Sequence, residues 1–299
     1  MTGKSSWAVG AFSALFAGAS YGFGGALSQV VRAQGFSVAH VTCAQYLCAT
    51  LILAVVVVVR FRSSVSLRQA IHLGMIGSMS ALSTLFYYCA IDLLSVGQAV
   101  AIQFQYVWIT VVIQAIVERR APGKRVIISA VLIVGGTLLG SGMADELLFG
   151  EGLASFSLMG FCFAMLCALF YAGFIYLNGR VAIEHPAPTR MLFATLGGAI
   201  VISLVTPDFF TGGCDIAAIA PGGMLMGFIM SVVPCLGLSV AAKRLPGGVV
   251  AILSSSELPV AVLAGFLMFG ESVTPLVVAG VVIICASIAL SQSDEISKR

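Results

Sequence analysis

The sequence predicts an all-α integral membrane protein of ten transmembrane helices, built as two inverted five-helix repeats around a central cavity, with both termini cytoplasmic. The first observation is composition: 60% of the 299 residues are hydrophobic, 9% are charged, and the mean hydropathy is +1.08. A soluble globular protein carries about 25% charged residues. The second and third observations are the number of apolar runs and the placement of the basic residues.

Ten apolar runs are long enough to cross about 30 Å of hydrocarbon, which takes roughly 20 helical residues. Their approximate limits are 8–31, 39–59, 70–91, 98–117, 124–141, 157–177, 188–205, 222–242, 249–269 and 275–291. The first run lacks a clear cleavage site for a signal peptide, so we expect it to be a helix of the protein. The loops are too short for an extramembrane domain, which argues against a soluble enzyme.

The basic residues lie almost entirely on one side of the predicted membrane. When alternate loops are assigned to opposite sides, only Arg32 of the 15 Lys and Arg residues falls on the side away from the N-terminus. The others are Lys4, Arg60, Arg62, Arg68, Arg119, Arg120, Lys124, Arg125, Arg180, Arg190, Lys243, Arg244, Lys298 and Arg299. The positive-inside rule therefore predicts that both termini are cytoplasmic.

Similar segments recur in the two halves of the chain, at residues 90–141 and 241–291. Leu94 aligns with Leu245, and Glu118 aligns with Glu271 if a slip of two residues is allowed. Because each half holds an odd number of helices, the second copy is inverted, and a site is expected between the halves. The predicted units are a first repeat at 8–141, an external linker at 142–156, a second repeat at 157–291 and a cytoplasmic tail at 292–299.

Glu257 lies near the middle of the ninth run, where an acidic residue costs roughly 2.5 to 3.5 kcal/mol and usually faces a bundle interior or a watery cavity. Ser254, Ser255 and Ser256 precede it, and Pro259 removes a backbone donor just beyond. Polar groups and a helix break thus coincide at mid-membrane, which is typical of a transporter binding site. The alternative is a structural kink, with serine hydroxyls on the freed carbonyls and Glu257 bonded to a neighbouring helix.

The fourth run is the most polar span of the first half, and several aromatic residues lie well inside other spans. The predicted substrate-binding residues are Tyr87, Gln103, Tyr106, Trp108, Tyr171, Ser255 and Glu257. Together they suit a ligand with a flat apolar part and a polar end. Interhelical hydrogen bonds and core packing are the alternative explanation for each one.

Other chemistries find little support in the residues. The eight cysteines lie mostly in apolar stretches without nearby histidines, so we expect no metal site, and no motif indicates a cofactor. One central carboxylate without a central histidine makes no catalytic constellation, so an enzyme is not expected. No basic run with interleaved aromatics indicates nucleic acid.

The run from Glu257-Leu258-Pro259 to Phe269-Gly270-Glu271, with Gly280 in the last helix, resembles the drug/metabolite transporter superfamily in its ten-helix metabolite exporter branch. The segment 105–109, Gln-Tyr-Val-Trp-Ile, resembles the aromatic amino-acid exporters of that branch. The resemblance implies a multi-pass protein of the bacterial inner membrane that exports amino acids, aromatic ones included, or similar metabolites by alternating access. Its partners would be the small-molecule substrate and the lipid bilayer, with a monomer as the working expectation. Export of drugs or cationic metabolites, and a channel-like facilitator, remain alternatives.

Overall fold

The computed structural model describes residues 3–61, 64–94, 96–149, 157–270 and 273–297, and every regular element in these ranges is helical. In the first half the helices are α1 Gly3–Gly22, α2 Gly24–Arg32, α3 Val38–Arg60, α4 Leu67–Ile91, α5 Val96–Gln103, α6 Tyr106–Glu118, α7 Lys124–Gly140 and α8 Met143–Phe149. In the second half they are α9 Leu158–Asn178, α10 Ala187–Val205, the 3-10 turn η1 Pro207–Phe209, α11 Ile216–Met226, the π-helical η2 Gly227–Val232, α12 Val233–Ala242, α13 Gly247–Ser254, α14 Glu257–Phe269 and α15 Pro275–Ser297.

Among the described residues, seven helices are long and apolar enough to cross a membrane. They are Val38–Arg60, Leu67–Ile91, Gln98–Glu118, Leu158–Asn178, Ala187–Val205, Ile216–Ala242 and Gly247–Phe269, while Pro275–Leu290 is apolar but shorter. The protein is therefore an all-helical, multi-pass membrane protein. Ten spans, two repeats and cytoplasmic termini stay predictions.

Two of these spans are interrupted near their middle. The turn at Phe104 and Gln105 separates α5 from α6, and the turn at Ser255 and Ser256 separates α13 from α14. In the second case the cause is Pro259, which lacks the N–H that would bond the carbonyl of Ser255 one turn earlier. The breaks place polar side chains near the middle of the spans, Gln105 at the first turn and Ser255 and Ser256 at the second.

The interrupted helices recur along the chain at one constant shift. The bounds of α5 and α6 become those of α13 and α14 when 151 is added, and the same shift takes the start of α7 to the start of α15. Both α6 and α14 also end in a left-handed residue, Arg119 with φ 50° and Gly270 with φ 66°. This common register supports the repeat but contradicts the predicted slip of two residues: Glu118 corresponds in register to Phe269, and not to Glu271, which lies outside the described residues.

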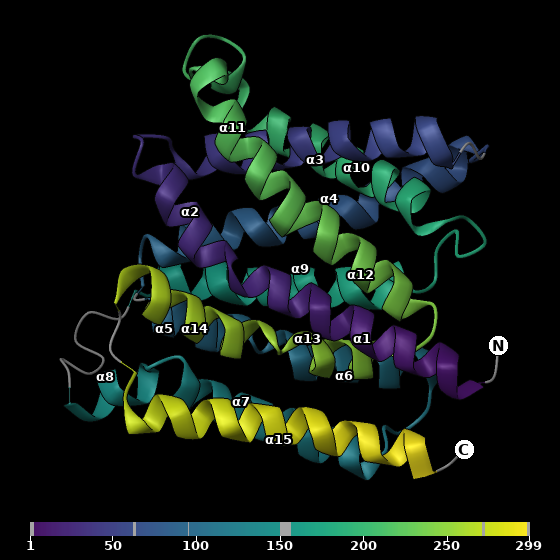
Figure 1. The fold of residues 1–299 in the computed structure, drawn as a ribbon, viewed down its shortest axis with the longest axis vertical. Coiled ribbons are helices and arrows are strands. Elements are labelled where there is room, and N and C mark those ends of the chain that lie inside the picture. The colour runs from purple at the N-terminus through teal and green to yellow at the C-terminus, as the bar shows by residue number, and fades with distance from the viewer. Residues whose placement is uncertain (1–2, 62–63, 95, 150–156, 271–272, 298–299) are drawn as a thin grey trace.

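Figure 1 shows both termini at the same end of the helical bundle, with α7 and α15 lying side by side. The Thr274 hydroxyl, just before α15, donates to an Asp145 carboxylate oxygen just after α7 at 2.7 Å, so these two helices run antiparallel. Gly280 of α15 lies directly against the backbone of Gly136 and Gly140 in α7. Small residues thus allow the close approach that drives helix association in lipid.

The boundaries predicted for the linker and the tail differ from the helices. Part of the predicted linker at 142–156 is helical, as α8, and its remainder at 150–156 lies outside the described residues. The last helix continues to Ser297, past the predicted end at 291, and residues 298–299 of the predicted tail also lie outside the described part.

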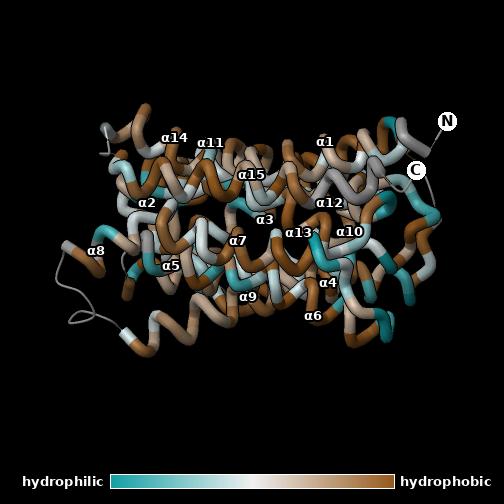
Figure 2. The backbone as a smooth tube through the Cα atoms, turned by 90° about the horizontal axis from the view of Figure 1, so that it is seen from below, coloured by the Kyte–Doolittle hydropathy of each residue, from teal (hydrophilic) through white to brown (hydrophobic). Residues whose placement is uncertain are grey.

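Polar contacts join different helices at each end of the bundle. At the end that holds the termini, Arg180 pairs with Glu118, and Lys243 Nζ donates to the His185 carbonyl at 2.6 Å. At the opposite end, Arg32 Nη2 lies 2.7 Å from Asp92 Oδ1. Figure 2 shows apolar residues along most helices and hydrophilic segments gathered at the end with the termini. This arrangement agrees with the sidedness predicted from the basic residues.

Candidate substrate cavity

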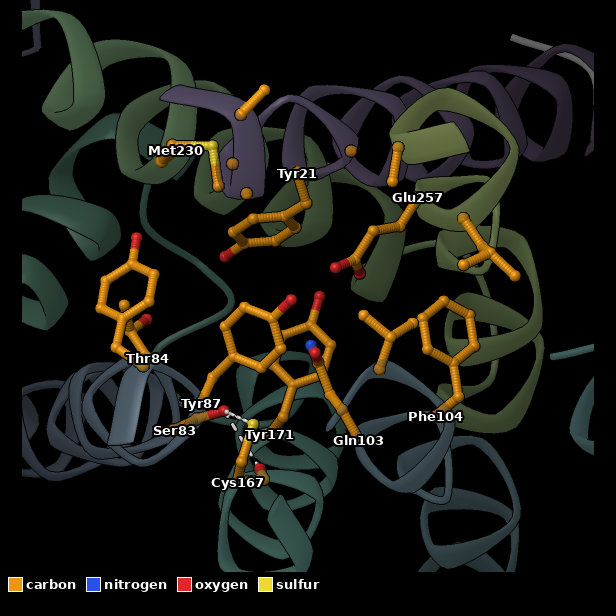
Figure 3. Close-up of a pocket in the computed structure, with 18 of the residues that line it drawn as sticks. Tyr21, Ser83, Thr84, Tyr87, Gln103, Phe104, Cys167, Tyr171, Met230 and Glu257 are labelled. Atoms are coloured by element: carbon orange, nitrogen blue, oxygen red, sulfur yellow. Dashed lines mark hydrogen bonds between the residues drawn. The ribbon is translucent and has the colours of Figure 1, made fainter. Parts of the chain in front are cut away.

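A cavity of about 130 Å³ lies between the two interrupted helices and their neighbours α1, α2, α4 and α9. A single water needs about 10 to 15 Å³ on this measure, so the cavity is large enough for a small organic molecule. It extends from Gln103 and Glu257 at the helix breaks to Gln29 and Phe269 near the end opposite the termini. Figure 3 shows polar side chains from several helices converging on it.

Glu257 is half-buried and is the first residue of α14, where the positive end of the helix dipole favours a carboxylate. Glycines in α1 allow that helix to approach the break closely: a side chain at Gly22 would meet the Glu257 carbonyl. Ser256 Oγ donates to the Leu15 carbonyl at 2.8 Å, which ties the break to α1. The break is thus held from one side while the Glu257 side chain points into the cavity (Figure 3).

The hydroxyls of Ser254 and Ser255 donate to the carbonyls of Val250 and Ala251, at 2.8 Å and 3.3 Å. These bonds within the helix fit the structural explanation for the serines. Ser255 is fully buried and does not line the cavity, so its predicted contact with substrate gains no support from its position. Glu257 differs from these serines, because its carboxylate faces the cavity.

Four of the seven predicted site residues line the cavity: Tyr87, Gln103, Tyr171 and Glu257. Figure 3 shows the hydroxyls of Tyr87 and Tyr171 and the amide of Gln103 directed toward the Glu257 carboxylate. Gln103 is a hydrogen-bonding neighbour of that carboxylate. These residues come from α4, α5, α9 and α14, so the tertiary fold brings together groups that are far apart in the sequence.

Tyr106 and Trp108 lie outside the cavity, for different reasons. Tyr106 is fully buried behind it, with its ring 4.7 Å from that of Tyr171 and its hydroxyl donating to the Ala251 carbonyl at 3.4 Å. Trp108 is 42% exposed, and its indole N–H donates to Gln105 Oε1 at 2.7 Å. Residues two positions apart on a helix point in directions about 200° apart, so Trp108 faces the outside of the bundle while Tyr106 faces inward. We therefore place Trp108 outside the proposed site.

A further wall of the cavity was represented in the predicted set by Tyr87 alone. Gln45 Nε2 donates to Ser231 Oγ at 2.9 Å, and the Tyr88 hydroxyl lies 3.5 Å from Gln45 Oε1. The polar residues of α4 that line this wall are Ser80, Ser83, Thr84, Tyr87 and Tyr88. Their spacing of three, four and seven residues along one helix was a readable signal of a polar face.

Glu257 is the one charged side chain among the described residues that line the cavity. Aromatic rings surround it, with Tyr21 and Tyr171 edge to face at 5.9 Å between ring centroids. Within the described residues, no group of three or more His, Cys, Asp or Glu side chains is placed to hold a metal ion. The cavity is thus acidic and aromatic, which suits an organic solute with a cationic group.

Residues 8–142 match the model of the EamA-like transporter family. The match covers less than half of the chain, and it shows that this part is similar to a family of membrane transporters. A solved structure titled only "Crystal structure of protein" superimposes with a TM-score of 0.78 at 14% sequence identity, covering 96% of this chain and 98% of that one. At this identity the likeness shows a shared fold alone. No curated protein matches the sequence.

Proposed function

We propose that this EamA-like protein is a secondary transporter that exports amino acids, aromatic ones included, or related small metabolites across the bacterial inner membrane by alternating access. The observation that supports the proposal is the mid-span cavity in which Glu257, Gln103 and three tyrosines from separate helices converge. Tyrosine rings supply contact area for a flat apolar group, and the carboxylate and amide supply contacts for a polar end. In the proposed orientation, the cavity opens to the outer side.

A second candidate is export of drugs or cationic metabolites that carry no carboxylate. The observation that favours it is that Glu257 is unaccompanied by a basic side chain among the described lining residues. A cation near Glu257 would gain an ionic contact and a contact with the face of a tyrosine ring, the latter worth about 0.5 to 2 kcal/mol. The two candidates share the site and differ in whether a substrate carboxylate is needed.

Counterflow in proteoliposomes tests the proposal directly. Vesicles preloaded with unlabelled phenylalanine are expected to accumulate labelled phenylalanine transiently and saturably, because a carrier exchanges bound substrate across the membrane. The assay is repeated with a panel of other amino acids and with tetraphenylphosphonium. Uptake that rises linearly with concentration indicates a channel-like facilitator, and uptake no greater than in protein-free vesicles for every amino acid contradicts the amino-acid proposal.

Contacts between the two predicted halves lie at the end that holds the termini. Gln114 Oε1 accepts from the Gly248 N–H at 2.8 Å, and Gln114 Nε2 donates to Glu118 at 3.1 Å. Glu118 pairs with Arg180, whose guanidinium lies 3.6 Å from the centre of the Tyr176 ring. These residues belong to α6, α9, the turn after α9 and α13, so the contacts must separate if the cavity is to open at this end. We call them the inner latch.

Replacing Arg180 with alanine is expected to weaken the inner latch and to raise the population that is open at this end by about threefold to thirtyfold. A half-exposed ion pair contributes about 0.2 to 1 kcal/mol and a cation–π contact about 0.5 to 1 kcal/mol. The measurement is the rate at which a membrane-impermeant thiol reagent, applied on the side of the termini, modifies Thr110→Cys in a background without native cysteines.

Arg244→Ala is the matched control for this prediction, because Arg244 Nη1 donates to the carbonyl of Val240 in its own helix. It is expected to leave the labelling rate unchanged. Equal rates in Arg180→Ala and in the parent protein would show that the inner latch does not govern access from this side.

A further inference from the structure

Two buried polar atoms at the cavity have no hydrogen-bond partner among the described residues: Gln103 Oε1 and the Tyr171 hydroxyl oxygen. The two residues are 8% and 5% exposed, and both line the cavity beside Glu257. A buried polar atom without a partner costs about 1 to 3 kcal/mol. Both atoms would therefore gain from a ligand that donates hydrogen bonds.

The orientation of the Gln103 amide follows from its neighbour. Gln103 Oε1 is the amide atom that has no partner, and Gln103 is a hydrogen-bonding neighbour of Glu257, so the amide nitrogen faces the Glu257 carboxyl group. The amide oxygen then remains as an acceptor. Figure 3 shows Gln103, Tyr171 and Glu257 directed toward one another from three different helices.

The Tyr171 ring offers its hydroxyl to the cavity and packs against three other rings. Tyr106 meets it at 4.7 Å with 74° between the ring planes, Phe174 stacks at 6.3 Å, and Tyr21 meets it at 5.9 Å. An open ring face would favour a bulky methylated cation through cation–π attraction. A hydroxyl oxygen instead favours a ligand with an N–H group, because that group can donate a hydrogen bond to it.

We propose that Glu257, Gln103 Oε1 and the Tyr171 oxygen together bind the NH3+ group of a primary amine and discriminate against its N-trimethyl counterpart. A primary ammonium has three N–H donors, one for each of these acceptors. This inference rests on the proposed function in that it assigns a substrate class to the same cavity. An N-trimethyl group carries the same charge but no N–H donor, so it leaves both buried oxygens without partners.

The test is equilibrium binding of two labelled probes to the purified full-length protein: 2-phenylethylamine and its N,N,N-trimethyl derivative. We expect the primary amine to bind at least about tenfold more tightly. Undetectable binding of the amine, or equal binding of the two probes, would overturn the inference. Binding with this selectivity but without counterflow would support the inference while contradicting the transport proposal, so the two failures are distinguishable.

Replacement of single acceptors separates recognition from folding. Tyr171→Phe keeps the ring and removes the oxygen, and it is expected to lower the selectivity for the primary amine about threefold to tenfold. Ser129→Ala is the control, because the Ser129 hydroxyl is also buried without a partner among the described residues but lies outside the cavity. Unchanged selectivity in Tyr171→Phe, with native thermal stability, would remove Tyr171 from the proposed set, and the same result in Gln103→Ala as well would overturn the three-acceptor site.

Discussion

Replacing Glu257 with glutamine is expected to weaken transport of amine-bearing substrates by roughly 10- to 150-fold in apparent affinity. Glutamine keeps the size and hydrogen-bonding capacity of the side chain but removes its charge. A hydrogen bond to a charged group contributes about 1.5 to 3 kcal/mol, and each 1.4 kcal/mol changes an equilibrium tenfold. We expect the lost affinity to be that for the cationic group of the substrate, because no other charged side chain lines the cavity among the described residues.

The measurement is concentration-dependent counterflow of each probe by Glu257→Gln in proteoliposomes. Glu184→Gln is the control, since Glu184 lies in the loop before α10 and bonds Gln69 far from the cavity. Native counterflow by Glu257→Gln for every substrate would favour the structural explanation, in which the carboxylate only stabilises the broken helix.

Replacing Gly280 with alanine is expected to destabilise the folded protein by about 1 to 3 kcal/mol, the usual cost of overpacking a close contact. The added methyl group would overlap the backbone of Gly136 and Gly140 in α7, and neither backbone can move aside as a flexible side chain could. The two helices would have to separate, weakening packing across the α7–α15 contact.

Gly135→Ala is the matched control, because a methyl group at Gly135 meets nothing within 4 Å in the same helix pair. Alanine also favours a helix by about 0.5 to 1 kcal/mol over glycine, so this variant is expected to be as stable as the parent or slightly more so. Thermal unfolding of both variants in detergent gives the comparison. Equal unfolding temperatures would mean that the α7–α15 contact adjusts without cost.

Much of the architecture could be predicted because bilayer physics acts on local sequence. A helix must satisfy its own backbone in lipid, so apolar length alone indicates where spans lie. The helix break before Glu257 could be predicted from Pro259 and the preceding serines. The break at Phe104 and Gln105 has no proline, and only its place one repeat before Ser255 and Ser256 points to it.

The candidate site was less completely predicted. Glu257 and Gln103 were readable because a polar side chain in lipid needs a reason wherever it lies along a span. Trp108 was misplaced because its type suggested a pocket while its position on α6 turns it outward. Gln45 and Tyr88 were omitted because nothing in α3 or α4 marks a break near them.

By itself, the sequence determined that the chain is helical and membrane-embedded and that it carries a carboxylate in the middle of an interrupted span, since these follow from hydropathy and backbone chemistry within one segment. Only the tertiary structure decided that Tyr87, Gln103, Tyr171 and Glu257 meet in one cavity while Tyr106 is sealed behind it. The physical reason is that a helix presents every direction around its axis, and the packing of its neighbours selects which side chains face a shared space.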